Sequence, residues 1–467
     1  MSERSGYDLA VIGAGSAAFA AAIRATSLGA SVALVERGTV GGTCVNVGCI
    51  PSKHLLAASH VYRASGDHPF EGVQTQQAGV DLPRLIATKD EVVHELREEK
   101  YIDLAAHYGF EIVHGHARFG GQDLLHVDGR EIEAARVVIA TGSAPWAPPI
   151  DGLDGAGYLT STTAMELEEL PESLVVIGGN YIGLELGQVF ANLGTKVTIV
   201  EALERIAPLE EPEISEIMTR VLEEQGVQVV TSAKVIRAES GPPKAVVAET
   251  GDGELRLAGA EILVATGRRP VLDRLDVEKA GVDIDDRDGL VLDETLRTSN
   301  SNVFAAGDVT GAPQFVYVAA AQGTLAAENA IGDARREMDY TALPRVTFTS
   351  PNIAAVGLTD EQARAAGRAC ECRVLELEHV PRARVNLDTR GLVKIVADSS
   401  SGRVLGVHVL AEDAGDVILA GVYAVKFGLT VDDLADTWAP YLTMAEGLRL
   451  AAQTFTRDVS KLSCCAA

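Results

Sequence analysis

Two cysteines, Cys44 and Cys49, lie five positions apart in the glycine-rich stretch of residues 41–53. Pro51 suits the first turn of a helix, because the backbone N–H that proline lacks is not needed there. A helix that begins near Cys49 places this thiol at its positive end, which lowers the thiol pKa and favours the reactive thiolate. Lys53 then lies one helical turn further along the same face. The stretch therefore predicts a redox-active dithiol rather than two buried structural cysteines.

A dinucleotide-binding fingerprint precedes the dithiol. The apolar run of residues 7–12 leads into a Gly-Ala-Gly turn and an alanine-rich stretch, and a second apolar run ends at an acidic residue. Gly13 and Gly15 allow a pyrophosphate to approach the N-terminus of the expected helix, and Ala18 supplies the small residue needed for helix–strand packing. Glu36 can accept a hydrogen bond from a ribose hydroxyl. The first part of the chain is therefore expected to bind a dinucleotide.

A second fingerprint starts with the apolar run of residues 174–177. Gly178 and Gly183 form its turn, and Glu201 ends its second strand. Two such units predict two dinucleotides, such as a flavin and a nicotinamide. Asp308 ends a later apolar run and is placed either for the polyol chain of the first cofactor or as an ordinary turn aspartate. The other residues predicted to line the cofactors are Gly42, Thr43, Thr141, Gly142, Gly267 and Gly307.

The order of these patterns predicts an α/β protein with two Rossmann-like domains and a C-terminal α+β domain. We expect the first part of the first domain at residues 1–150, because three prolines punctuate the chain near its end. The second dinucleotide domain follows at residues 151–272, and the chain returns to the first domain at residues 273–341. Residues 342–467 contain no glycine fingerprint and form the third domain.

Composition limits the partners. The chain has 467 residues, too many for one core, and 66 acidic residues against 40 lysines and arginines give a net charge of −26. Such a surface repels nucleic acid and anionic membranes, so we expect neither as a partner. No run of about 18 uncharged apolar residues is present, and the N-terminus predicts no secretory signal. We therefore expect a cytoplasmic protein.

Four further cysteines form two close pairs. Cys370 and Cys372 alternate on a predicted strand, which favours packing or surface placement over metal binding. Cys464 and Cys465 lie in a short, weakly apolar C-terminal tail, and ordinary disulfide geometry disfavours a bridge between adjacent cysteines. We therefore expect this second pair to be metal ligands. The acidic runs at residues 166–169 and 210–213 are expected to be solvated.

The dithiol stretch and the two fingerprints together resemble the pyridine nucleotide–disulfide oxidoreductases over essentially the whole chain. This resemblance implies FAD on the first fingerprint, a nicotinamide coenzyme on the second, and a homodimer with shared active sites. It also implies that Cys44 is the outer thiol and that Cys49 contacts the flavin. Lys53 is then expected near the flavin N5, paired with Glu185, and Tyr181 is expected to cover the flavin.

Two departures from the disulfide-reducing members favour the branch of this family that reduces Hg(II). The first departure is Tyr441, and the second is the adjacent pair Cys464–Cys465. Tyr441 occupies the position of the histidine that protonates a leaving thiolate. The resemblance further implies that the pair Cys464–Cys465 takes Hg(II) from thiol complexes and passes it to Cys44 and Cys49. Soft thiolates suit a soft ion such as Hg(II). Two alternatives remain open, a dihydrolipoamide dehydrogenase-like or thioredoxin reductase-like disulfide reductase, and a flavoprotein that stores metal without turnover.

The nicotinamide coenzyme is less clearly indicated. Glu201 alone favours NADH, because an acid at this position accepts from the ribose 2′-hydroxyl and repels a 2′-phosphate. The family resemblance favours NADPH, and Arg205 lies close enough in sequence to bind a phosphate. We expect NADPH, with NADH as the alternative.

Overall fold

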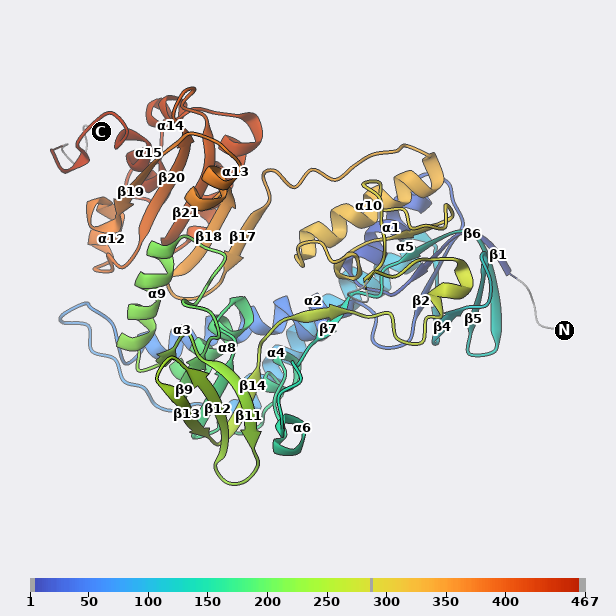
Figure 1. Cartoon of the computed structure of the whole chain (residues 1–467), viewed down its shortest axis with the longest axis horizontal. Helices are drawn as coiled ribbons and strands as arrows, with labels where there is room; N and C mark the ends of the chain where they lie inside the picture. The colour runs from blue at the N-terminus through green and yellow to red at the C-terminus, as the bar shows by residue number, and fades with distance from the viewer. Residues whose placement is uncertain (1–4, 286–288, 462–467) are drawn as a thin grey trace. The chain divides into compact units, whose positions relative to one another are not determined.

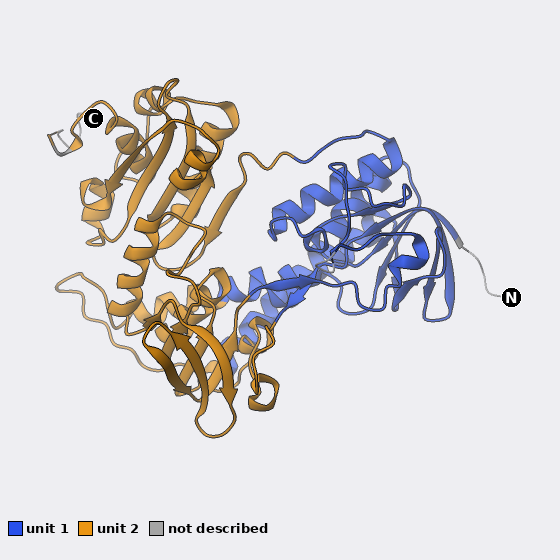
Figure 2. Ribbon diagram, in the orientation of Figure 1, with its two compact units in different colours: residues 1–54, 83–146, 267–338 blue, residues 55–82, 147–266, 339–467 orange. Residues whose placement is uncertain are grey.

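The computed structural model describes residues 5–285 and 289–461. Its chain groups into two compact units, each made of three separate segments (Figure 2). Unit 1 comprises residues 1–54, 83–146 and 267–338, and unit 2 comprises residues 55–82, 147–266 and 339–467. Our four-segment domain division stays a prediction. Within the described residues, no helix combines the length and the apolar character that crossing a membrane requires.

Unit 1 is built on a seven-stranded sheet of order β3-β2-β1-β6-β5-β4, with β16 also paired to β6. The strands β1, β2, β3 and β16 are parallel to their neighbours, as in a Rossmann-like domain. The strands are β1 (Ser5–Ile12), β2 (Val32–Glu36), β3 (Glu111–His114), β4 (Ala117–Phe119), β5 (Leu124–Val127), β6 (Arg130–Ile139) and β16 (Val303–Ala305). A separate short ribbon pairs β7 (Ser143–Pro145) with β15 (Arg268–Pro270).

Helices α1 (Ser16–Ser27) and α10 (Val316–Gly332) run side by side against this sheet (Figure 1). Small residues permit the close contact, since a Cβ atom on Gly323 would lie 2.1 Å from the carbonyl oxygen of Ala17. The other helices of unit 1 are α2 (Gly42–Val47), the start of α3 (Cys49–Ala64), nearly all of α4 (Leu82–Arg97), the π-helical turn η1 (Glu98–Ile102), α5 (Asp103–Tyr108), and the 3₁₀ turns η2 (Val277–Ala280) and η3 (Asp308–Thr310).

Unit 2 contains a second parallel sheet of order β10-β9-β8-β14 and a three-stranded antiparallel sheet of order β11-β12-β13. Its strands here are β8 (Ser173–Ile177), β9 (Lys196–Val200), β10 (Gln228–Val230), β11 (Lys234–Glu239), β12 (Lys244–Thr250), β13 (Gly253–Gly259) and β14 (Glu261–Val264). The helices of this part are α6 (Leu153–Ala156), α7 (Ser161–Ala164), α8 (Tyr181–Asn192) and α9 (Pro212–Glu224).

The C-terminal part of unit 2 is a five-stranded antiparallel sheet of order β17-β18-β21-β20-β19, with α13 packed on it. Its strands are β17 (Pro344–Thr347), β18 (Asn352–Gly357), β19 (Cys370–Glu376), β20 (Leu392–Asp398) and β21 (Val404–Ala411). Its helices are α11 (Asp360–Ala365), the turn η4 (Leu377–His379), α12 (Pro381–Val385), α13 (Ala414–Phe427), α14 (Val431–Asp436), α15 (Glu446–Gln453) and the turn η5 (Val459–Lys461). The predicted fold class is confirmed.

The acidic run of residues 210–213 is not solvated, so our expectation for it was wrong. Glu210 and Glu211 are buried, with 2% and 1% of their surface exposed. Arg345 of β17 donates to both carboxylate oxygens of Glu210, at 3.0 Å each. The buried Lys394 of β20 donates to Glu211 at 2.9 Å and also binds Glu213. These pairs join the start of α9 to the C-terminal sheet.

The charge of Lys394 depends on these partners. Burial opposes the charge, but hydrogen bonds to Glu213 and Glu211 hold the pKa of Lys394 above its usual value. We predict that Lys394→Met lowers the free energy of unfolding by about 3–5 kcal/mol, because Glu211 is then buried without its cation. The measurement is chemical denaturation at neutral pH. Adding Glu211→Gln to Lys394→Met should recover part of the loss.

Arg220→Ala is the matched control. Arg220 and Glu216 form an exposed pair with atoms 3.9 Å apart. Removing it should change the unfolding free energy by less than about 0.5 kcal/mol. Equal effects of the two substitutions would show that the buried pairs do not hold this part of unit 2 together.

Candidate functional site

The first fingerprint turn lies where β1 passes into α1. Gly13 has a φ of +113°, and a Cβ atom there would lie 2.3 Å from the carbonyl oxygen of Ala140 at the end of β6. Gly15 is the N-cap of α1, and Ala18 is fully buried in that helix. The backbone thus has the close turn that the sequence predicted, and binding of a pyrophosphate at this helix N-terminus stays a prediction.

The dithiol loop packs directly on this turn. A Cβ atom on Gly42 would lie 2.5 Å from the Cα atom of Gly15, and the Gly41 N–H donates to the carbonyl oxygen of Ala14 at 2.8 Å. Asn46 holds the loop from inside, because its amide donates to the carbonyl oxygens of Val40 and Gly42. Asn46 lies between the two cysteines but was not predicted to be a site residue.

Cys44 lies in α2, and Cys49 is the first residue of α3, as predicted. In the part of the chain that the structure describes, Cys44 and Cys49 form no disulfide, and both side chains are half-buried. A hydrogen bond with Cys49, burial and the negative charge of Cys49 together raise the pKa of Cys44, and Lys53 opposes this. We therefore expect the dithiol to lose its first proton at Cys49, because the N-terminus of α3 stabilises a thiolate there.

A chain of polar contacts links Asp308 to two residues that the sequence analysis missed. The Ser143 hydroxyl donates to Asp308 Oδ2 at 2.6 Å, and Arg268 Nε donates to the Ser143 hydroxyl at 2.8 Å. Arg268 also reaches Thr43 Oγ1 at 3.5 Å. Burial lowers the pKa of Arg268, and the negative charge of Asp308 opposes this. Ser143 and Arg268 each directly follow an Ala-Thr-Gly ending, which was the available clue.

The observed residues of unit 1 fit a dinucleotide. The hydroxyl oxygen of Thr141 is buried, and among the residues that the structure describes it has no hydrogen-bond partner. Glu36 accepts the Gly38 N–H at 2.6 Å and lines a hollow beside this turn. The hollow is lined by Ile12, Gly13, Val35, Glu36, Arg37, Gly115, His116, Ala117, Thr141, Val271, Asp273 and Leu275. Gly142, Gly267 and Gly307 lie in the same unit, each with a positive φ.

The second fingerprint turn, in unit 2, repeats the geometry of the first. A Cβ atom on Gly178 would lie 2.5 Å from the carbonyl oxygen of Ala265, and one on Gly183 would lie 1.9 Å from that of Gly178. The buried Oδ1 of Asn180 has no hydrogen-bond partner within residues 5–285 and 289–461. Glu201 accepts the N–H groups of Gly179 at 2.7 Å and of Leu203 at 2.9 Å. This turn also fits a dinucleotide.

Tyr181 and Glu185 lie on α8, just after this turn. Burial, followed by the negative charge of Glu210, raises the pKa of Tyr181 to about 12, although Arg345 opposes this. Glu185 is buried and accepts the Phe348 N–H at 2.9 Å. Glu185 and Lys53 belong to different units, so their pairing stays a prediction.

Tyr441 precedes α15 and has 52% of its surface exposed. The nearby Glu446 is buried, and burial raises its pKa. Cys464 and Cys465 lie outside the described residues.

Comparison with known proteins defines the class. Residues 7–323 match the family described as pyridine nucleotide-disulphide oxidoreductase, and residues 343–452 match the dimerisation domain of that family. The chain belongs to the pyridine nucleotide–disulphide oxidoreductases. It therefore uses a flavin and a pyridine nucleotide.

Its relatives narrow the class further. The chain is 56% identical to a mercuric reductase of Streptomyces lividans, covering 99% of both chains. It is 52% identical to a mercuric reductase of Bacillus cereus, over 98% of this chain and 73% of that one. Among solved structures, the Cu(II) complex of the HOCl-induced flavoprotein disulfide reductase RclA from Escherichia coli is similar, with a TM-score of 0.87 and 32% identity over 97% of this chain and 100% of that one.

The ionisation order of the thiols gives a spectroscopic prediction. The two-electron-reduced enzyme should show a long-wavelength absorption band from a thiolate beside the oxidised flavin. Cys49→Ser should abolish the band, because Cys49 is the thiol that ionises first at the N-terminus of α3. Cys44→Ser should keep it. The measurement is an anaerobic reductive titration, and an intact band in Cys49→Ser would refute the assigned roles.

Proposed function

We infer that this chain is a mercury(II) reductase, which reduces Hg(II) to Hg(0) with electrons from a reduced pyridine nucleotide. The observation that carries this inference is the Cys44–Cys49 dithiol together with Tyr441. This tyrosine lies where the resemblance to disulfide-reducing members of the family implies a histidine. Mercuric reductases similar over almost the full chain support it. Because the reaction consumes reduced coenzyme and needs free thiols, we place the enzyme in the cytoplasm.

The proposed reaction balances without an organic leaving group. Hg(II) exchanges onto the Cys49 thiolate and the Cys44 thiol. The Cys44 proton passes to one of the two thiolates that brought the ion, and the other thiolate takes its proton from solvent. Two electrons from NAD(P)H then convert the ion to Hg(0), and the coenzyme leaves as NAD(P)+ while the proton of its hydride is released to solvent. Both sulfur–mercury bonds break, and the cysteines keep the bonding electrons as thiolates. The bound flavin supplies a two-electron carrier between coenzyme and metal. No organic thiolate is protonated, so the reaction does not require a histidine acid.

The protein residues have separate tasks in this proposal. Cys49 provides the first thiolate, and Cys44 keeps its proton until the metal displaces it. Lys53 and Arg268 supply positive charge to a site that gains two thiolates, which lowers the free energy of the anionic form. Asp308, oriented by Ser143, binds the polyol chain of the flavin, which we take to be FAD. Tyr181 covers the flavin until the nicotinamide displaces it.

A disulfide reductase is the second candidate. The similar Escherichia coli structures favour it, because they are structures of a flavoprotein disulfide reductase. The storage alternative is weaker, because holding a metal ion requires neither a flavin nor a coenzyme site.

NADPH is the coenzyme that we propose. Both oxygens of the Glu201 carboxylate already accept backbone N–H groups, so this acid is occupied inside the protein. The dipoles of these N–H groups partly offset the negative charge of Glu201 and so weaken its repulsion of a 2′-phosphate. Arg205 follows four residues later and can supply positive charge to a phosphate.

We propose a homodimer in which the C-terminal segment of one subunit completes the site of the other. The match to a dimerisation domain supports this, and so does the exposed apolar side of α13. Leu419, Tyr423 and Phe427 on this helix are 52%, 51% and 67% exposed, which is unusual for large apolar side chains in a monomer. Tyr441 and the pair Cys464–Cys465 then lie beside the partner's dithiol.

The first test is a substrate comparison. HgCl2 with excess monothiol should oxidise NADPH at least about 100-fold faster than lipoamide or glutathione disulfide does, because a positioned general acid contributes about 10²–10⁴-fold to disulfide reduction. Repeating the assay with NADH should give the lower kcat/KM. Cys44→Ser should remove the mercury-dependent rate. Faster turnover of either disulfide would favour the second candidate instead.

The second test concerns transfer between subunits. A mixed dimer joins a Cys464→Ala/Cys465→Ala chain to a Cys44→Ala/Cys49→Ala chain. A symmetric dimer has two routes from the tail of one subunit to the dithiol of the other. The mixed dimer keeps one of these routes. If delivery occurs between subunits, the mixed dimer should therefore show about half the wild-type rate with thiol-bound Hg(II). Each parent homodimer serves as a control and should be slow. A mixed dimer no faster than its parents would rule out delivery between subunits.

A further inference from the structure

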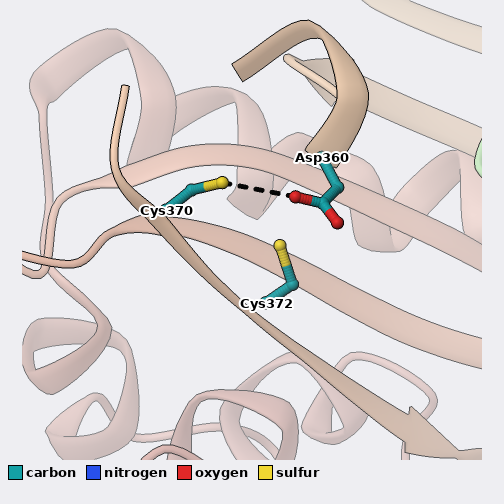
Figure 3. A group of neighbouring side chains, drawn as sticks. All are labelled: Asp360, Cys370 and Cys372. Atoms are coloured by element: carbon teal, nitrogen blue, oxygen red, sulfur yellow. Dashed lines mark hydrogen bonds between the residues drawn. The ribbon is translucent and has the colours of Figure 1, made fainter. Parts of the chain in front are cut away.

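Cys370 and Cys372 gather with Asp360 in unit 2 (Figure 3). The three ligand atoms, two sulfurs and one carboxylate oxygen, lie within 4.8 Å of one another. The Cys370 thiol donates to Asp360 Oδ1 at 3.3 Å. Figure 3 shows both sulfurs directed toward the Asp360 carboxylate. Sequence spacing favoured simple packing for this cysteine pair and did not bring in Asp360.

We propose that Asp360, Cys370 and Cys372 form a second mercury-binding site, separate in sequence from the redox dithiol and from the C-terminal pair. The inference goes beyond the proposed reduction, because it assigns binding and not turnover. The proposed site needs only these three side chains as ligands.

The backbone holds the three ligands in place. Cys370 and Cys372 are two residues apart on β19 and therefore point to the same side of the sheet. Their strand is fixed in register by pairing with Asp398 and Val396 of β20. Asp360 opens α11, and its N–H donates to the buried Glu211 at 2.7 Å. Little backbone movement is needed to bring a metal ion between the sulfurs.

The ligand set suits Hg(II) better than the commoner zinc ion. Structural zinc sites close a tetrahedron with four protein ligands, and the described residues offer only three at this place. Two thiolate ligands are enough to coordinate a soft ion such as Hg(II), and the carboxylate can add a weaker third contact. The two sulfurs lie within 4.8 Å of each other, which is close enough for one metal ion to bind both. All three side chains are partly exposed, so thiol complexes of the metal can reach them.

Charge balance supports the same assignment. Two thiolates and one carboxylate carry three negative charges, and Hg(II) supplies two positive charges. Arg364 supplies the third, since its guanidinium donates to both oxygens of Asp360, at 2.7 and 3.1 Å. In the exchange, two sulfur–mercury bonds to the carrier thiols break and two form to the protein. The protons of Cys370 and Cys372 pass to the departing thiols, and nothing is oxidised or reduced.

The test uses the full chain with the other four cysteines replaced by serine, Cys44, Cys49, Cys464 and Cys465. This protein is mixed with HgCl2 and excess glutathione and desalted, and its metal is counted by elemental mass spectrometry. We expect one Hg(II) per chain. Adding Cys370→Ser and Cys372→Ser should abolish binding, whereas Val374→Ala, on the same side of β19, should retain it. Asp360→Asn should weaken binding about 10- to 100-fold, as loss of a supporting carboxylate does.

Two further measurements keep the outcome clear. Equal thermal midpoints and flavin contents would show that the variants are folded. In the otherwise wild-type enzyme, Cys370→Ser/Cys372→Ser should bind one fewer Hg(II) per chain. Equal mercury contents with and without the two cysteines would overturn the proposal. Binding of ZnCl2 but not of HgCl2 under the same thiol competition would also overturn it, and an unchanged affinity in Asp360→Asn would remove Asp360 from the site.

Discussion

Direct backbone contact between two glycines sets the position of the redox chemistry. Gly42 lies against Gly15 with no side chain between them, so the dithiol loop rests on the first fingerprint turn. A Cβ atom on Gly42 would lie 2.5 Å from the Gly15 Cα atom, so a larger residue at position 42 would lift the loop away from this turn. Electron transfer between a thiolate and a flavin requires contact. The close approach of these two glycines therefore matters more than the number of residues that separate the two motifs along the chain. The hydrogen bonds of Asn46 then fix the internal shape of the loop.

Much of this arrangement could be predicted because it is encoded locally. The strand, turn and helix of each fingerprint are adjacent in sequence, and the structure begins α3 at Cys49 as the Pro51 pattern indicated. The buried acids at Glu210 and Glu211 could not be predicted in the same way. Their cations, Arg345 and Lys394, are well over a hundred residues away, and a charge run without its partners looks like a solvated surface.

The missed site residues share this cause. Ser143 and Arg268 lie on β7 and β15, which pair only after the chain has completed the whole second dinucleotide unit. Their link to Asp308 therefore depends on three distant segments. Asp360 is only ten residues from Cys370, but the turn between α11 and β19 decides whether they meet. Sequence spacing on one strand describes the two cysteines and cannot bring in a ligand from a neighbouring helix.

Unit 1 is made of three separate segments of the chain, so its sheet can be completed only late in synthesis. Strand β16 pairs with residues 137–139 of β6, and its three residues are all buried. A ribosome adding about 5–20 residues per second needs roughly 8–30 s to proceed from the end of β6 to β16. Throughout that interval the nascent chain presents an apolar strand with an unpaired edge, a known template for aggregation. Production of this protein is therefore expected to depend on translation speed and on chaperones that shield that edge.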